Sequence, residues 1–106
     1  MAQKTVLLVE DDPDIRDIVQ DVLEAEGYDV VPASHGRQAL EFLNGTRGAE
    51  RPDLVILDMM MPLVDGQHVL EAIRSDDQLS SVPVVVMSAV EHEKPEGAAA
   101  FLRKPF

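Results

Sequence analysis

Three acidic residues stand where two apolar runs of the sequence end. Glu10 and Asp11 directly follow the apolar run at residues 5–9, and Asp58 directly follows the run at 54–57. Carboxylates that end two neighbouring buried strands meet at one edge of a parallel sheet, where they repel one another unless a cation neutralises them. The chain has no cysteine, and no histidine stands near these positions. An all-oxygen site of this kind favours a hard cation, and Mg²⁺ is the cation that we predict.

A carboxylate at such a site can also act as a nucleophile. Because Mg²⁺ shares its coordination with phosphate oxygens, the acidic residues indicate a site that holds a phosphoryl group. Asp58 would attack that group and become an aspartyl phosphate, while the cation offsets the charge on the transferring group. A buried strand end is a costly place for charge without a task, so we interpret all three residues as functional. Asp12 and Asp14 precede a predicted helix, and we interpret them as helix-capping residues.

Short apolar runs alternate with amphipathic stretches along the whole chain. The runs predict strands at residues 5–9, 29–32, 54–57, 82–87 and 101–103. Between them, Asp12, Ser34 and Asp65 are predicted to cap three helices, and Gly27 is predicted to end the first. This alternation predicts an α/β fold, a doubly wound five-stranded parallel sheet of flavodoxin-like order 2-1-3-4-5. In that order the ligand crevice lies between the first and third strands, which are the strands that end at the three carboxylates.

The composition excludes several classes of protein. The 106 residues suit a single domain, and 45% of them are hydrophobic, which is too many for a disordered chain. No apolar run is long enough for a membrane span, and no signal peptide is evident. The absence of cysteine fits a cytoplasmic protein. A formal net charge of −11 argues against direct binding to nucleic acid, which needs clustered Lys and Arg.

Five short motifs, in this order, resemble those of the receiver domains of two-component response regulators, the CheY-like superfamily. The resemblance covers essentially the whole chain, and the motifs are specific when taken together. They are Val9-Glu10-Asp11-Asp12-Pro13, residues 53–62, Asp65-Gly66, Ser88-Ala89 and Lys104-Pro105-Phe106.

The resemblance implies a role for each residue at the acidic site. Asp58 matches the phospho-acceptor of the family. Asp11 matches a direct ligand of Mg²⁺, and Glu10 matches a ligand that acts through water. The backbone carbonyl of Met60 would complete the metal shell.

The resemblance also implies partners for the phosphoryl group. Ser88 matches the hydroxyl that bonds one phosphoryl oxygen, and Lys104 matches the lysine that pairs with another. The Lys104–Pro105 peptide bond is expected to be cis. Phe101 takes the place of the switch aromatic, which turns inward when Ser88 moves, although a packed core aromatic is an alternative interpretation.

The sequence departs from the family pattern in three places. Only residues 89–103 separate Ser88 from Lys104, so we expect the fourth helix to be shortened or absent. The sequence ends at Phe106, where the last helix should begin, so we expect a truncated domain with open apolar surface beside the first helix. A continuing chain or a partner would cover that surface. Met60 and Val90 hold the positions that usually tune loss of the phosphate, and they predict slow self-dephosphorylation.

These observations predict a phosphorylation-dependent signalling switch. The chain would receive its phosphoryl group from a sensor histidine kinase or a phosphotransfer protein of a phosphorelay, and change its affinity for a downstream protein. We expect it to catalyse only its own phosphorylation and dephosphorylation, and a homodimer is left open.

The main alternative is a pseudo-receiver that binds partners without phosphorylation. A Mg²⁺-dependent phosphohydrolase would need an acid where Met60 stands, and a flavin-binding protein would need a phosphate loop after the first strand.

Overall fold

The computed structural model describes residues 4–45, 51–58, 66–77, 79–88 and 100–103. Its sheet has five strands in the order β2-β1-β3-β4-β5, and every neighbouring pair is parallel. The strand order and the α/β class are those predicted from the sequence. The elements are β1 (Thr5–Val9), α1 (Pro13–Ala25), β2 (Asp29–Ala33), α2 (Gly36–Gly45), β3 (Leu54–Asp58), α3 (Gly66–Ser75), β4 (Val84–Ser88) and β5 (Ala100–Arg103).

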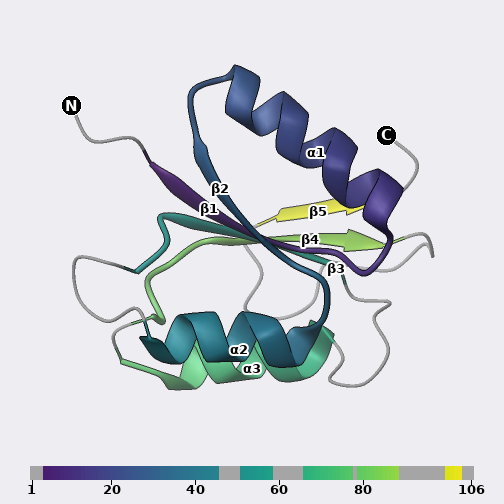
Figure 1. The fold of residues 1–106 in the computed structure, drawn as a ribbon. Coiled ribbons are helices and arrows are strands. Elements are labelled where there is room, and N and C mark those ends of the chain that lie inside the picture. The colour runs from purple at the N-terminus through teal and green to yellow at the C-terminus, as the bar shows by residue number, and fades with distance from the viewer. Residues whose placement is uncertain (1–3, 46–50, 59–65, 78, 89–99, 104–106) are drawn as a thin grey trace.

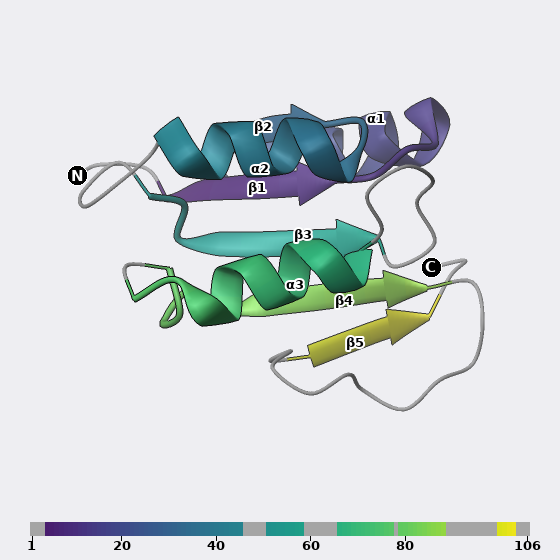
Figure 2. The same ribbon diagram turned by 90° about the horizontal axis from the view of Figure 1, so that it is seen from below.

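The described helices cover both faces of the sheet. In Figure 1, α1 lies above the strands, and α2 and α3 lie side by side below them. Because every neighbouring pair is parallel, the carboxyl ends of the strands share one edge, and Figure 2 shows the arrows pointing the same way. The doubly wound arrangement is therefore confirmed. The predicted shortening of a fourth helix falls on residues 89–99, which lie outside the described residues.

Strand β1, which lies between β2 and β3, is buried on both sides. Val6 and Leu8 pack in the cluster on the α1 side, whereas Leu7 and Val9 pack in the cluster with α2 and α3. All four side chains are completely buried. A continuous apolar run is typical of a strand between two helical layers. Because β1 is buried to its last residue, Glu10, which follows it, is also buried.

Both ends of α1 follow the signals in the sequence. The Asp12 side chain accepts hydrogen bonds from the backbone N–H groups of Asp14 and Ile15, which is the capping role predicted for it. At the other end, Gly27 has a φ of 97°, a value that glycine adopts without strain. The Tyr28 N–H reaches back to the Leu23 carbonyl at 3.1 Å, closing the helix end.

The start of α2 differs from the prediction. His35 is partly buried, and its Nδ1 accepts a hydrogen bond from the Gln38 N–H at 3.1 Å. The predicted cap, Ser34, instead donates from its N–H and its hydroxyl to the Gln38 side-chain oxygen. The imidazole takes over because a neutral histidine nitrogen is also an acceptor, and it stands directly before the first helical residue.

Strand β4 begins two residues later than predicted. Arg74, in the last turn of α3, donates to the carbonyls of Ser80 and Val82, and these bonds hold the preceding segment as a turn. Pro83 has no N–H to give to a ladder, although its carbonyl accepts from Val55. The strand therefore starts at Val84, and it ends at Ser88, one residue beyond the predicted end.

Helix α1 leaves apolar side chains in solvent. Ile18 is 63% exposed and Val22, one turn later, is 59% exposed. Exposed apolar side chains of this kind are candidates for a contact surface, and the predicted open sheet face beside α1 stays a prediction. Among the residues that the structure describes, no helix combines the length and apolar character needed to span a bilayer.

Asp53 links the amino ends of β1 and β3, at the edge of the sheet opposite the acidic residues. Its carboxylate accepts the Thr5 N–H at 2.8 Å, and its own N–H donates to the Thr5 carbonyl at 2.8 Å.

We expect Asp53→Ala to lower the free energy of unfolding by about 1 kcal/mol, because it removes the hydrogen bond from the Thr5 N–H to the side chain and keeps the backbone bond to the Thr5 carbonyl. Urea denaturation beside Asp77→Ala, an exposed control, measures the effect. Equal stability of the two variants would contradict a contribution from this bond.

Candidate metal centre

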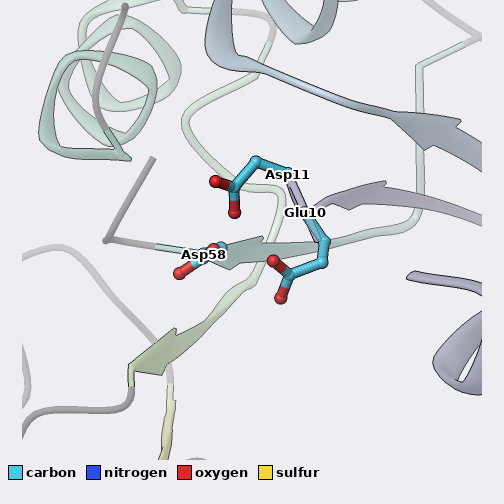
Figure 3. Close-up of side chains that lie close together, drawn as sticks. All are labelled: Glu10, Asp11 and Asp58. Atoms are coloured by element: carbon cyan, nitrogen blue, oxygen red, sulfur yellow. The ribbon is translucent and has the colours of Figure 1, made fainter. Parts of the chain in front are cut away.

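The sheet register brings the acidic residues together. Val9 of β1 pairs with Leu57 of β3, so the residues that follow them, Glu10 and Asp58, emerge from adjacent strands at the same edge. Asp11 comes next after Glu10. One ligand oxygen from each of the three carboxylates lies within 4.8 Å of the others. Figure 3 shows the three side chains gathered at the end of β3, and we call this group the acidic cluster.

Two members of the acidic cluster are buried. Glu10 is 0% exposed and Asp58 is 1% exposed, whereas Asp11 is accessible to solvent. Like charges at this separation repel strongly when little water screens them, and burying a carboxylate carries a further desolvation cost. A cation relieves both costs. Three carboxylate oxygens without nitrogen or sulfur fit the ligand preference of a hard divalent cation such as Mg²⁺.

A turn in the backbone lets consecutive residues serve one site. Side chains at successive strand positions point to opposite faces, so Glu10 and Asp11 could not both reach Asp58 from a continuing strand. The ladder stops where the Glu10 N–H donates to the Ala33 carbonyl at 3.0 Å, and the chain bends at Asp11. The Asp12 N–H then donates to Glu10 Oε2 at 3.1 Å, which orients that carboxylate.

The start of α1 adds favourable electrostatics. The helix begins at Pro13, two residues after Asp11, so its N-terminal end lies next to the acidic cluster. Unpaired N–H groups give a helix N-terminus a partial positive charge, which favours nearby anions. Asp12 caps this end and is absent from the cluster, in agreement with its predicted role.

The other predicted site residues are described only in part. Ser88 ends β4, one residue after Met87, which pairs with Asp58, so its backbone lies at the same edge of the sheet. Phe101 lies in β5 and pairs with Val86, but the structure describes the side chain of neither Ser88 nor Phe101. Met60, Val90 and Lys104, with the Lys104–Pro105 bond, lie outside the described residues.

One contact at the site was not predicted from the sequence. Arg16 of α1 donates from Nη1 to the backbone carbonyl of Glu10 at 2.9 Å. The sequence contains only a weak signal for it, an arginine in the first turns of a helix that follows an acidic pair. Hydrogen bonds to a backbone carbonyl depend on where a helix lies, and residue types alone do not determine that.

Comparisons with known proteins agree on one family. The family model described as the response regulator receiver domain matches residues 6–106. The sporulation initiation phosphotransferase F of Bacillus subtilis (strain 168) is 34% identical over 112 residues, which cover 100% of this chain and 86% of that protein. The response regulator protein TrrA from Thermotoga maritima, solved in complex with Mg²⁺-BeF, superposes with a TM-score of 0.84 at 30% identity. That match covers 98% of this chain and 89% of TrrA.

Some relatives are much longer than this chain. The DNA-binding dual master transcriptional regulator RpaA of Synechocystis sp. is 36% identical over 109 residues, which cover 95% of this chain. The chain spans 43% of the length of RpaA. It therefore corresponds to one part of such proteins.

Proposed function

The chain belongs to the response regulator receiver domain family, and we propose that its Asp58 accepts a phosphoryl group with the aid of Mg²⁺. Receiver domains serve phosphorylation-dependent signalling, in which they interact with histidine kinases or phosphotransfer proteins and with downstream targets. The observation that carries the proposal is the acidic cluster, in which one oxygen from each of the three carboxylates lies within 4.8 Å of the others, at one edge of the sheet.

Asp58 is the nucleophile of the proposed reaction. One of its carboxylate oxygens attacks the phosphorus atom of a phosphohistidine on the donor protein. The phosphorus–nitrogen bond breaks, and its electron pair stays on the imidazole nitrogen. The product on Asp58 is a mixed anhydride, an aspartyl phosphate. Burial favours this reaction, because a carboxylate with little hydration gives up less solvation when it attacks.

The metal ligands come from the acidic cluster and from the segment after it. Asp11 and Asp58 would hold Mg²⁺ directly, and Glu10 would hold it through water. By resemblance to the family, the Met60 carbonyl, which lies outside the described residues, would complete the shell. When bound, Mg²⁺ neutralises charge on the cluster and on the transferring group. The Asp12 N–H supports this arrangement by holding Glu10 Oε2 in place.

The remaining predicted residues respond to the phosphoryl group. Ser88 donates its hydroxyl to one phosphoryl oxygen, and the Lys104 ammonium pairs with another. Movement of Ser88 toward the phosphate opens space for Phe101 to turn inward. This shift changes the population of the active state and, with it, the affinity for a downstream protein. The domain acts as a switch and catalyses only its own phosphorylation and dephosphorylation.

The partners of the chain are proteins. A sensor histidine kinase or a histidine phosphotransfer protein supplies the phosphoryl group, and a downstream protein reads the result. The net charge of −11 disfavours direct contact with nucleic acid and with anionic membrane surfaces, and we propose a cytoplasmic location. The exposed Ile18 and Val22 offer an apolar contact to a partner protein, of which a second copy of the chain is one.

Intact-mass spectrometry tests the proposed function. The purified chain is incubated with acetyl phosphate and Mg²⁺, and a parallel sample contains excess chelator. We expect one phosphoryl adduct with Mg²⁺ and none with chelator. If a folded chain forms no adduct in either sample, the alternative of a phosphorylation-independent interaction module replaces the switch.

We also expect the phosphoryl group to be lost slowly. The side chains at positions 60 and 90 are Met and Val, and neither can orient a water molecule for attack on the aspartyl phosphate. After removal of acetyl phosphate, the decay of the adduct is followed by mass spectrometry. Met60→Glu, which places a carboxylate at that position, should accelerate the decay. A wild-type half-life of only seconds would contradict this prediction.

A further inference from the structure

Arg16 contacts the peptide unit that joins the two acidic residues. Its Nη1 donates to the Glu10 carbonyl at 2.9 Å, and the guanidinium is partly buried. Its own backbone N–H donates to the Asp12 carbonyl at 2.9 Å, as part of the first turn of α1. One residue of the helix is therefore bonded on both sides of Asp11.

We propose that Arg16 is a positioning residue for the metal site, an inference that rests on the metal binding proposed above. The Glu10 carbonyl belongs to the planar peptide that links Glu10 to Asp11. Fixing that oxygen fixes the plane, and the plane sets the direction in which the Asp11 side chain leaves the backbone. The guanidinium thereby holds Asp11 where its carboxylate reaches Glu10 and Asp58 within 4.8 Å.

Two further hydrogen bonds constrain the same turn, and both donors are backbone groups. The Glu10 N–H donates to the Ala33 carbonyl, and the Asp12 N–H donates to Glu10 Oε2. Substitution removes neither donor. Arg16 supplies the side-chain donor of the set, and its rigid, permanently charged fork suits a fixed carbonyl better than a flexible ammonium does. The contribution of the bond from Arg16 to the Glu10 carbonyl can therefore be tested by substitution of Arg16.

Because Arg16 is charged, the direction in which its substitution changes Mg²⁺ affinity distinguishes two roles. A cation near the site repels Mg²⁺, so loss of that charge alone would tighten Mg²⁺ binding. Loss of positioning would weaken it, because the three carboxylates would no longer be held for one ion. Substitutions of residues that orient metal ligands commonly weaken binding by about 10- to 100-fold. The two roles thus predict changes in opposite directions.

Isothermal titration of Mg²⁺ into the purified chain tests the proposal. We expect Arg16→Met to raise the dissociation constant by about 10- to 100-fold. Arg16→Lys, which keeps the charge and one donor, should bind Mg²⁺ more tightly than Arg16→Met and less tightly than wild type. Arg37→Met removes the same charge from an exposed site on α2 and should match wild type. Asp53→Ala controls for lost stability, since it acts at the opposite edge and should leave the dissociation constant unchanged.

The outcomes separate this proposal from the proposed metal site. Unchanged or tighter binding by Arg16→Met would overturn the positioning role while leaving the metal site intact. If Arg16→Met does not fold, Arg16→Lys decides: binding equal to wild type would overturn the proposal, and weaker binding would support it. Wild-type protein that binds no Mg²⁺ would overturn the metal site itself and the role of Arg16 with it.

Discussion

Asp58→Asn is expected to abolish the phosphoryl adduct that wild-type protein forms with acetyl phosphate and Mg²⁺. The amide has nearly the shape of the carboxylate, but it carries no anionic oxygen to attack phosphorus. The loss should be complete, because no other member of the acidic cluster is both buried like Asp58 and placed at the end of β3. Intact-mass spectrometry after incubation checks the result.

Two matched substitutions control for the chemical change itself. Asp77→Asn alters an exposed carboxylate in the turn after α3 and should leave the adduct unchanged. Asp12→Asn alters a carboxylate close to the cluster, but asparagine also caps helices well, so α1 and the adduct should both persist. An adduct of normal yield on Asp58→Asn would show that another residue is the acceptor.

The second large effect concerns stability and Mg²⁺. A ligand that binds only the folded state at 1,000 times its dissociation constant stabilises that state by about 4 kcal/mol. We expect Mg²⁺ to raise the melting temperature of wild-type protein accordingly, at about 4–8 °C for each kcal/mol. Asp11→Ala should show no such increase, because it removes a direct ligand from the acidic cluster.

Without metal the same cluster should be a source of instability. Asp58→Asn removes one of two buried charges, so in chelator it should melt at a higher temperature than wild type. Thermal melts of wild type, Asp11→Ala, Asp58→Asn and the Asp77→Asn control, each with Mg²⁺ and with chelator, measure both effects. An equal Mg²⁺-induced increase in Asp11→Ala and wild type would contradict the predicted ligand set.

The parts of the fold that depend on periodicity were predictable from the sequence. Continuous apolar runs mark strands buried on both faces, and the alternation with helices determines a parallel sheet. The strand order then places residues 10 and 58 side by side without any knowledge of side-chain conformation. This is why the convergence of Glu10, Asp11 and Asp58 could be predicted and is present in the structure.

The features that the sequence did not predict depend on the exact positions of neighbouring groups. His35 replaces Ser34 as the acceptor at the start of α2, because the helix begins one residue later than a serine cap would require. Strand β4 starts late, because Arg74 reaches carbonyls in the preceding turn. The bond from Arg16 to Glu10 likewise depends on how α1 lies against the end of β1. Each of these contacts depends on a helix position that a one-dimensional pattern does not contain.

The central claim is that the phosphoryl group is received on Asp58, and peptide mapping of the phosphorylated wild-type chain tests it most directly. The protein is phosphorylated with acetyl phosphate in Mg²⁺, reduced with borohydride to trap the acyl phosphate, digested and analysed by fragment-ion mass spectrometry. The account predicts a Mg²⁺-dependent modification at Asp58 alone. Modification at Glu10, Asp11 or Asp12, or an unmodified Asp58 in a folded chain, would contradict it.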